Sequence, residues 1–191
     1  MISVVSPAKT LDYETEVPSV GYSVSEHLSE SRKLMRELKV LDPENLASMM
    51  GLSEKLADLN FERNMNWKGD RDLKKTSRQA IYAFKGDVYT SLDAGSLNEK
   101  QIKFLDNHLR ILSGLYGILK PLDLMEPYRL EMGTKFKNSQ VKDLYEFWGK
   151  KIAVSLAKAL ESHKNRSILN LASVEYFSSV QLSELKLPVF S

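Results

Sequence analysis

A segment near the middle of the chain carries residue types suited to contacting phosphate. The tetrapeptide Gly114-Leu115-Tyr116-Gly117 has two glycines, and glycine lets the backbone approach a partner closely. We predict that a helix over 98–112 enters this hairpin and a second helix follows it, whose first amides would donate to phosphate without reading base identity. The alternative is an ordinary corner between two helices with a glycine cap. The candidate DNA-binding residues of this segment are Arg110, Ser113, Gly114, Tyr116, Gly117 and Lys120.

A lysine follows the first predicted strand of the chain. Lys9 comes after Ser6-Pro7-Ala8, and the carboxyl ends of strands are where α/β sheets place their ligands. Lys9, with Thr10 and Asp12, would then face a cleft. The alternative is a capping loop in which Thr10 or Asp12 satisfies backbone amides and Lys9 is solvated.

Two further pairs of charged residues have a spacing that puts them on one face. Arg78 and Lys85 are seven apart, so on a helix they would lie together and could follow a phosphate backbone. Arg129 and Glu131 share a face if their segment, 128–132, is a strand. They would either pair with each other or leave Arg129 facing a polyanion. An ordinary basic surface is the alternative for Arg78 and Lys85.

The net charge of +2 conceals an uneven distribution of charged residues. Residues 1–62 hold 6 basic and 11 acidic side chains, whereas residues 63–85 hold 7 basic and 2 acidic ones. A basic block beside an acidic one can mark a nucleic-acid surface. A solvated basic helix or loop would have the same composition.

Composition and spacing argue against several other classes of site. The chain has no cysteine, which excludes thiolate catalysis and cysteine metal sites in these residues. His27, His108 and His163 lie in no metal-ligand spacing, and phosphate-loop and dinucleotide fingerprints are absent. We therefore predict no metal and no cofactor. No apolar run approaches the length of a membrane span and the N-terminus does not resemble a signal peptide, so we expect no membrane partner and a cytoplasmic location.

The elements that must position these residues include both helices and strands. Strands are predicted at 2–5 and 167–172, and helices at 25–40, 43–50, 53–59, 78–84, 98–112 and 143–160. This pattern predicts a mixed α/β fold with a central mixed sheet flanked by helices, in a single domain over 1–191. Pro188-Val189-Phe190 reads as the start of another strand, so we expect the full-length protein to continue beyond Ser191.

Six ordered stretches resemble the YaaA family of peroxide-stress proteins. They span nearly the whole chain and are Ser6–Asp12, Arg78–Tyr89, His108–Gly117, Pro121–Gly133, Asp143–Trp148 and Asn170–Phe177. The resemblance implies a compact α/β unit with a positively charged cleft and a helix-hairpin-helix-like element that binds DNA. It also implies a role in limiting iron-dependent damage from hydrogen peroxide.

Two functions follow as expectations. The first is DNA binding, to duplex or distorted DNA and largely without sequence specificity, through Lys9, Arg78, Lys85 and Arg129 together with the glycine hairpin. The second is an enzyme of undefined reaction in the same cleft, whose acid, base and anion-binding groups would be Lys9, Asp87, Asp123, Arg129 and Glu131. A small enclosed pocket around these groups would favour the enzyme, and a long basic groove would favour DNA.

Overall fold

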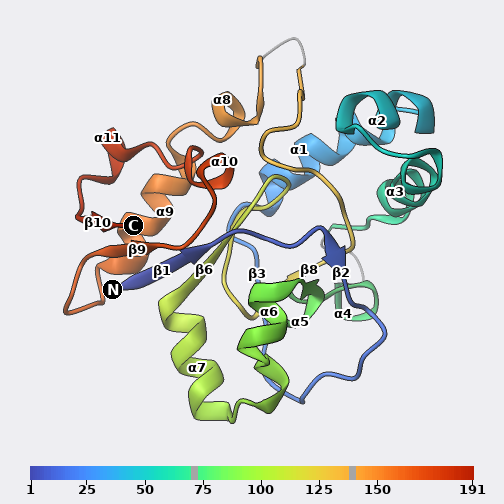
Figure 1. The fold of residues 1–191 in the computed structure, drawn as a ribbon. Helices are drawn as coiled ribbons and strands as arrows, with labels where there is room; N and C mark the ends of the chain where they lie inside the picture. Colours follow the sequence, from blue (N-terminus) through green and yellow to red (C-terminus); the bar gives the residue numbers. More distant parts are fainter. Residues whose placement is uncertain (70–72, 138–140) are drawn as a thin grey trace.

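A five-stranded sheet forms the centre of the protein. The structure is a computed structural model that describes residues 1–69, 73–137 and 141–191. The strand order is β10 (Val189–Phe190), β9 (Ile168–Asn170), β1 (Ile2–Val5), β6 (Leu109–Ser113) and β7 (Gly117–Leu119). The first four strands run parallel, and β7 returns antiparallel to β6. The predicted strand at 2–5 is therefore the middle strand of the sheet, and Lys9 follows its carboxyl end (Figure 1).

Two small sheets lie beyond that end of β1. The strands β2 (Thr10–Leu11) and β5 (Phe84–Lys85) form an antiparallel pair. In the other sheet, β8 (Asp123–Met125) lies between β3 (Ser23–Val24) and β4 (Arg78–Gln79). These short ladders tie the first 25 residues to the segments around 80 and 124.

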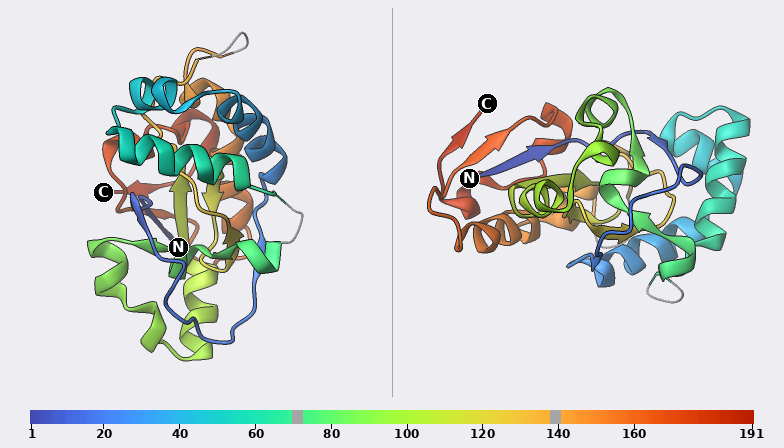
Figure 2. Two further views of the ribbon diagram at one scale, coloured as in Figure 1. Left: turned by 90° about the vertical axis from the view of Figure 1, so that its right-hand side faces the viewer. Right: turned by 90° about the horizontal axis from the view of Figure 1, so that it is seen from below.

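Helices surround the sheets in three groups (Figures 1 and 2). The teal helices α2 and α3 lie at the opposite end of the molecule from the orange and red helices α9–α11, and the green α5–α7 lie on a third side. The helix α1 lies between the two ends, where His27 at its start hydrogen-bonds to Ser155 of α9. Their bounds are α1 (Leu28–Lys39), α2 (Pro43–Met50), α3 (Glu54–Asn66), α4 (Leu73–Thr76), α5 (Ala80–Ala83), α6 (Asp87–Leu92), the 3₁₀ helix η1 (Ala94–Ser96), α7 (Glu99–His108), α8 (Leu144–Trp148), α9 (Lys151–Leu160), α10 (Val174–Phe177) and α11 (Leu182–Leu185). Within the described residues, no helix is long and apolar enough to cross a membrane.

Local capping explains where several helices begin and end. The Asp42 carboxylate accepts from the Asn45 amide at the start of α2, with Pro43 in the first turn, and Gly51 ends that helix at φ 64°. Asn98 and Gln101 form a reciprocal capping box at the start of α7. These interactions satisfy amides and carbonyls that a helix leaves without partners at its ends.

The central hairpin β6–β7 is buried. Leu112 and Leu115 are 0% exposed and Tyr116 is 1% exposed. Trp148 packs on the hairpin, and its indole Nε1 donates to the Gly114 carbonyl at 2.9 Å. A Cβ at Gly117, which has φ 70°, would lie 2.6 Å from the Trp148 ring, so this turn requires glycine.

The helix predicted over 98–112 is wrong in its last turn. The helix α7 ends at His108, and Leu109–Ser113 pairs with β1 as strand β6. A strand that is buried on both faces has a continuous apolar run, which periodicity alone does not distinguish from helix. The helix-hairpin-helix-like element predicted here is therefore a β-hairpin.

Three other predicted elements also differ from the structure. The helix over 78–84 is split into β4, α5 and β5 by pairing with β8 and β2. The helix over 143–160 breaks at Gly149, whose φ is 47°, into α8 and α9. Residues 126–131 lie outside any helix or strand, so the strand expected at 128–132 is absent from this described segment.

Candidate functional site

Pairing of β2 with β5 brings together two of the predicted DNA-binding lysines. Thr10 is the partner of Lys85, and Leu11 is the partner of Phe84. Lys9 immediately precedes β2, so both lysines lie at one end of this two-strand ladder. Their proximity results from antiparallel pairing, because Lys85 lies on a strand and not on the helix predicted for it.

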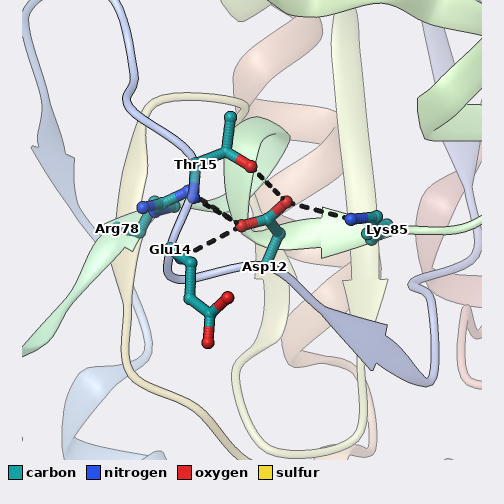
Figure 3. Close-up of polar contacts among 5 residues, drawn as sticks. All are labelled: Asp12, Glu14, Thr15, Arg78 and Lys85. Carbon is teal, nitrogen blue, oxygen red and sulfur yellow. Dashed lines mark hydrogen bonds and ion pairs between the residues drawn. The ribbon is translucent and has the colours of Figure 1, made fainter.

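The carboxylate of Asp12 organises the first half of the site (Figure 3). It accepts hydrogen bonds from the amides of Glu14 at 3.1 Å and Thr15 at 2.9 Å, and from the Thr15 hydroxyl at 2.8 Å. It also forms ion pairs with Arg78 at 3.5 Å and with Lys85 at 3.3 Å. Asp12 therefore satisfies backbone amides of a turn, as in the capping alternative. The same carboxylate also holds two of the predicted cations.

These hydrogen bonds keep Asp12 ionised. The Thr15 amide, then the Thr15 hydroxyl and the Glu14 amide, hold the pKa of the Asp12 carboxyl well below its usual range, and Lys85 adds to the effect. Each of these donors stabilises the charged form of the acid. Asp12 is thus an anchor for cations, and it carries no proton to transfer near neutral pH.

Glu131 organises the second half of the site. Its carboxylate lies 3.1 Å from the Lys9 Nζ and 2.8 Å from the Arg129 Nη2. The pairing of Arg129 with Glu131, one of the two sequence alternatives, is confirmed. The Arg129 Nε is buried and has no hydrogen-bond partner among the described residues.

Exposure separates the four predicted cations into two kinds. The side chains of Lys9 and Lys85 are 67% and 60% exposed, so both reach solvent. The side chains of Arg78 and Arg129 are only 11% and 17% exposed. The lysines can contact a ligand directly. The arginines pair with the carboxylates and add positive electrostatic potential beneath the surface.

A fifth cation, Arg63 on α3, completes the site. Arg63 and Lys85 line a cavity of about 370 Å³ beside Asp12 and Glu14. Burial lowers the pKa of Arg63, and the nearby Arg129 lowers it further. We call these eight residues, five cations and three carboxylates, the cationic cluster: Lys9, Asp12, Glu14, Arg63, Arg78, Lys85, Arg129 and Glu131.

Four predicted binding residues lie in the core instead. Ser113 is 0% exposed, and its hydroxyl accepts from the Tyr116 amide and lies 2.6 Å from the Tyr128 hydroxyl. Gly114 and Gly117 are buried too. Side-chain packing of the hairpin leaves Ser113, Gly114, Tyr116 and Gly117, which the sequence predicted to contact DNA, without exposed surface for such a contact.

Within the part of the chain that the structure describes, neither Arg110 nor Lys120 forms a hydrogen bond or ion pair with the cluster. The Arg110 Nη1 donates to the carbonyls of Asp106 at 2.8 Å and Leu109 at 2.7 Å, and burial lowers its pKa. The amide of Lys120 donates to Asp123 at 2.8 Å. The guanidinium of Arg110 therefore supports the turn between α7 and β6, whereas Lys120 contributes its backbone amide to the turn before β8.

The groups proposed for an enzyme are only partly brought together. Lys9 and Arg129 converge on Glu131. Asp123 is 2% exposed and accepts from the Ser23 hydroxyl at 2.6 Å, and burial raises its pKa. Asp87 is exposed at the start of α6. Asp123 therefore serves the small sheet β3–β8–β4 and not the cluster.

Sequence reasoning placed Arg63 in the basic block but did not assign it to the site. Its contribution depends on how α3 packs beside residues 12–15, which no local pattern encodes. Asp70, Arg71 and Asp72 of the same block lie outside the described residues, as does the side chain of Lys74. A local signal for the Asp12 turn does exist, since Asp side chains commonly accept hydrogen bonds from the backbone amides that follow them in turns.

Comparison with known proteins identifies the family. The chain matches the family described as "Peroxide stress protein YaaA" along residues 1–191. It is 52% identical to a UPF0246 protein of Polynucleobacter necessarius subsp. necessarius (strain STIR1) over 191 residues, which are 100% of this chain and 74% of that protein. It is 49% identical to one of Aliivibrio fischeri (strain MJ11) over 186 residues, covering 97% of this chain and 71% of that protein. A third, of Teredinibacter turnerae, is 47% identical over 191 residues, covering 100% and 74%. The chain belongs to the YaaA peroxide stress protein family.

Proposed function

We propose that the protein binds DNA largely without sequence specificity, as part of the cytoplasmic response to hydrogen peroxide. The observation that carries the proposal is the cationic cluster, where five cations from separate parts of the chain gather around three carboxylates. A polyanion recruited to such a surface releases its condensed counterions, which supplies most of the free energy of non-specific binding. A link to limiting iron-dependent damage is a further part of the proposal and rests on the family resemblance.

The two lysines are the expected phosphate contacts. Each is held by one carboxylate, Lys9 by Glu131 and Lys85 by Asp12, and each remains mostly exposed. A lysine ammonium has three donors, so one ion pair leaves others for a phosphate oxygen. The carboxylates restrict the lysine side chains, which reduces the entropy cost of ordering them when DNA binds.

The experiment is a fluorescence anisotropy titration with a labelled 20-base-pair duplex at low salt. Lys9→Ala and Lys85→Ala are each expected to weaken binding several-fold, and both should unfold at the wild-type temperature because the side chains are exposed. Lys100→Ala on α7, an exposed lysine away from the cluster, is the control and should bind like the wild type. No binding by the wild type, or equally weakened binding in all three variants, would contradict the proposal.

An enzyme is the second candidate, favoured by the buried Arg129 Nε that has no partner among the described residues. Buried polar groups are nearly always hydrogen-bonded, and a catalytic role or a bound water or ion is among the explanations of an exception. Arg129 beside Glu131 would then bind an anionic substrate. A test is isothermal titration of small carboxylates and phosphates against the wild type and Arg129→Lys, which keeps the charge but lacks the Nε–H donor. Binding of a small anion by the wild type that Arg129→Lys abolishes would favour the enzyme. Absence of such binding by the wild type would contradict it.

A further inference from the structure

A second cation-rich region lies between α1 and the residues that follow α3. It is a concavity of about 700 Å³, which we call the basic groove. Five cations line it, and none of its described lining residues is acidic. They are Arg32, Lys33, Arg36 and Lys39 from α1, and Lys68 from the opposite wall.

The helix α1 aligns its cations because its other face is in the core. Leu34, Met35 and Leu38 are at most 1% exposed. Arg32, Arg36 and Lys39 follow at intervals of four and three residues, so they form one stripe that is about 10 Å long at 1.5 Å rise per residue. Lys33 lies on the rim, where it pairs with Glu30 at 3.4 Å.

The opposite wall is held in place by a buried acid. Glu126 is 2% exposed, and its carboxylate accepts from the amides of Lys68 at 3.0 Å and Gly69 at 2.7 Å. It also accepts from the Thr76 hydroxyl at 2.8 Å. Lys39 crosses between the walls and donates to the Trp67 carbonyl at 2.9 Å. The groove is therefore preformed, which reduces the cost of ordering a ligand site.

The groove also has an apolar part. Met65 is 51% exposed, while Met35 and the mostly buried Trp67 form the floor. A thioether adapts to flat or irregular partners and interacts favourably with aromatic rings. Cations on two walls with an apolar surface between them match a ligand that has an anionic end and a flat, apolar end.

We propose that the basic groove binds a nucleoside phosphate with two or more phosphate groups. Its volume lies in the range of small-molecule sites, roughly 300–1,000 Å³, and cations on both walls can contact the phosphates of a diphosphate. A duplex would meet the rim of such a concavity and not both of its walls. The last turns of α3 separate it from the cationic cluster, since Arg63 lines the cluster cavity while Met65 lines the groove.

The test is isothermal titration calorimetry with ADP, pyrophosphate and adenosine at low salt. ADP is expected to bind at a single site, pyrophosphate more weakly, and adenosine not measurably. Arg36→Glu changes an exposed position of the groove and should weaken the binding of ADP about ten-fold. The reason is the change in Coulomb energy between this side chain and a phosphate about 6 Å away across screened solvent.

Lys55→Glu is the matched control. Lys55 is exposed in the first turn of the same helix α3, about 15 Å along the axis from the groove, and a glutamate there suits the helix dipole. It should leave ADP binding within two-fold of wild type. No saturable ADP binding, or an equal weakening in both variants, would overturn the proposal. Loss of duplex binding in Arg36→Glu without any ADP binding would assign the groove to DNA and also overturn it.

Discussion

Replacing Gly114 with Ala tests the placement of the glycine hairpin in the core. A Cβ built at Gly114 lies 2.1 Å from the Leu130 carbonyl oxygen and 2.9 Å from its carbon. The obstacle is backbone, so relief requires a shift of about 1 Å in a segment packed against β6. Overpacking of this kind costs about 3 kcal/mol of unfolding free energy, at the upper end of the usual range. For a chain of 191 residues that lowers the unfolding temperature by roughly 6–12 °C.

The assay is a thermal melt followed by far-UV circular dichroism, with Gly21→Ala as control. A Cβ at Gly21 meets nothing within 4 Å, so this variant should unfold within about 1–2 °C of wild type. Leu130 lies between Arg129 and Glu131, so any loss of DNA binding by Gly114→Ala should accompany its loss of stability. A variant with an unchanged melting temperature and impaired DNA binding would refute the reasoning, because it would describe an exposed, phosphate-contacting hairpin.

Two further predictions concern the buried Glu126 and the half-buried His27. Glu126→Gln replaces a charged group that accepts from three donors by a neutral amide. The free energy of unfolding, measured in urea, should fall by about 2–3 kcal/mol. A change below about 0.5 kcal/mol would contradict the role given to this carboxylate. Burial lowers the pKa of His27 below its usual value of 6.5, so near that pH the unfolded chain binds more protons than the folded protein. The contribution of His27 to stability is therefore complete above pH 6.5 and is lost as pH falls below it. His27→Gln should flatten the fall in stability between pH 7 and 5, and an equally steep fall in the variant would exclude His27 as the cause.

Local features of the fold could be predicted from the sequence wherever one short segment decides the structure. Asp42-Pro43 and Gly51 bound α2 as predicted, and the strand at 2–5 is present. The helix predicted over 25–40 is confirmed as α1. Capping chemistry and amphipathic periodicity act within a few residues, so a single sequence contains the information.

Elements that depend on distant partners could not be predicted in the same way. The run Leu109–Ser113 becomes a strand because β1 is available to pair with it. Lys85 meets Asp12 because β5 pairs with β2, and Arg78 reaches the same carboxylate from β4, which pairs with β8. Tertiary pairing of this kind overrides local propensity.

The candidate site shows the same division. The Arg129–Glu131 pair, two residues apart, could be predicted as an ion pair. The contact of Lys9 with Glu131 joins positions far apart in the sequence, and only the folded chain reveals it. The basic groove was not predicted, because one wall comes from α1 and the other from residues after α3.

The most direct test of the central claim is the salt dependence of duplex binding by the double variant Lys9→Ala/Lys85→Ala. For the wild type, the logarithm of the binding constant should fall linearly with the logarithm of salt concentration. Removing one lysine–phosphate interaction should reduce that slope by about one, so the slope of the double variant should be smaller by about two, while Lys100→Ala should keep the wild-type slope. A double variant with the wild-type slope and affinity would contradict the claim that this cluster holds DNA.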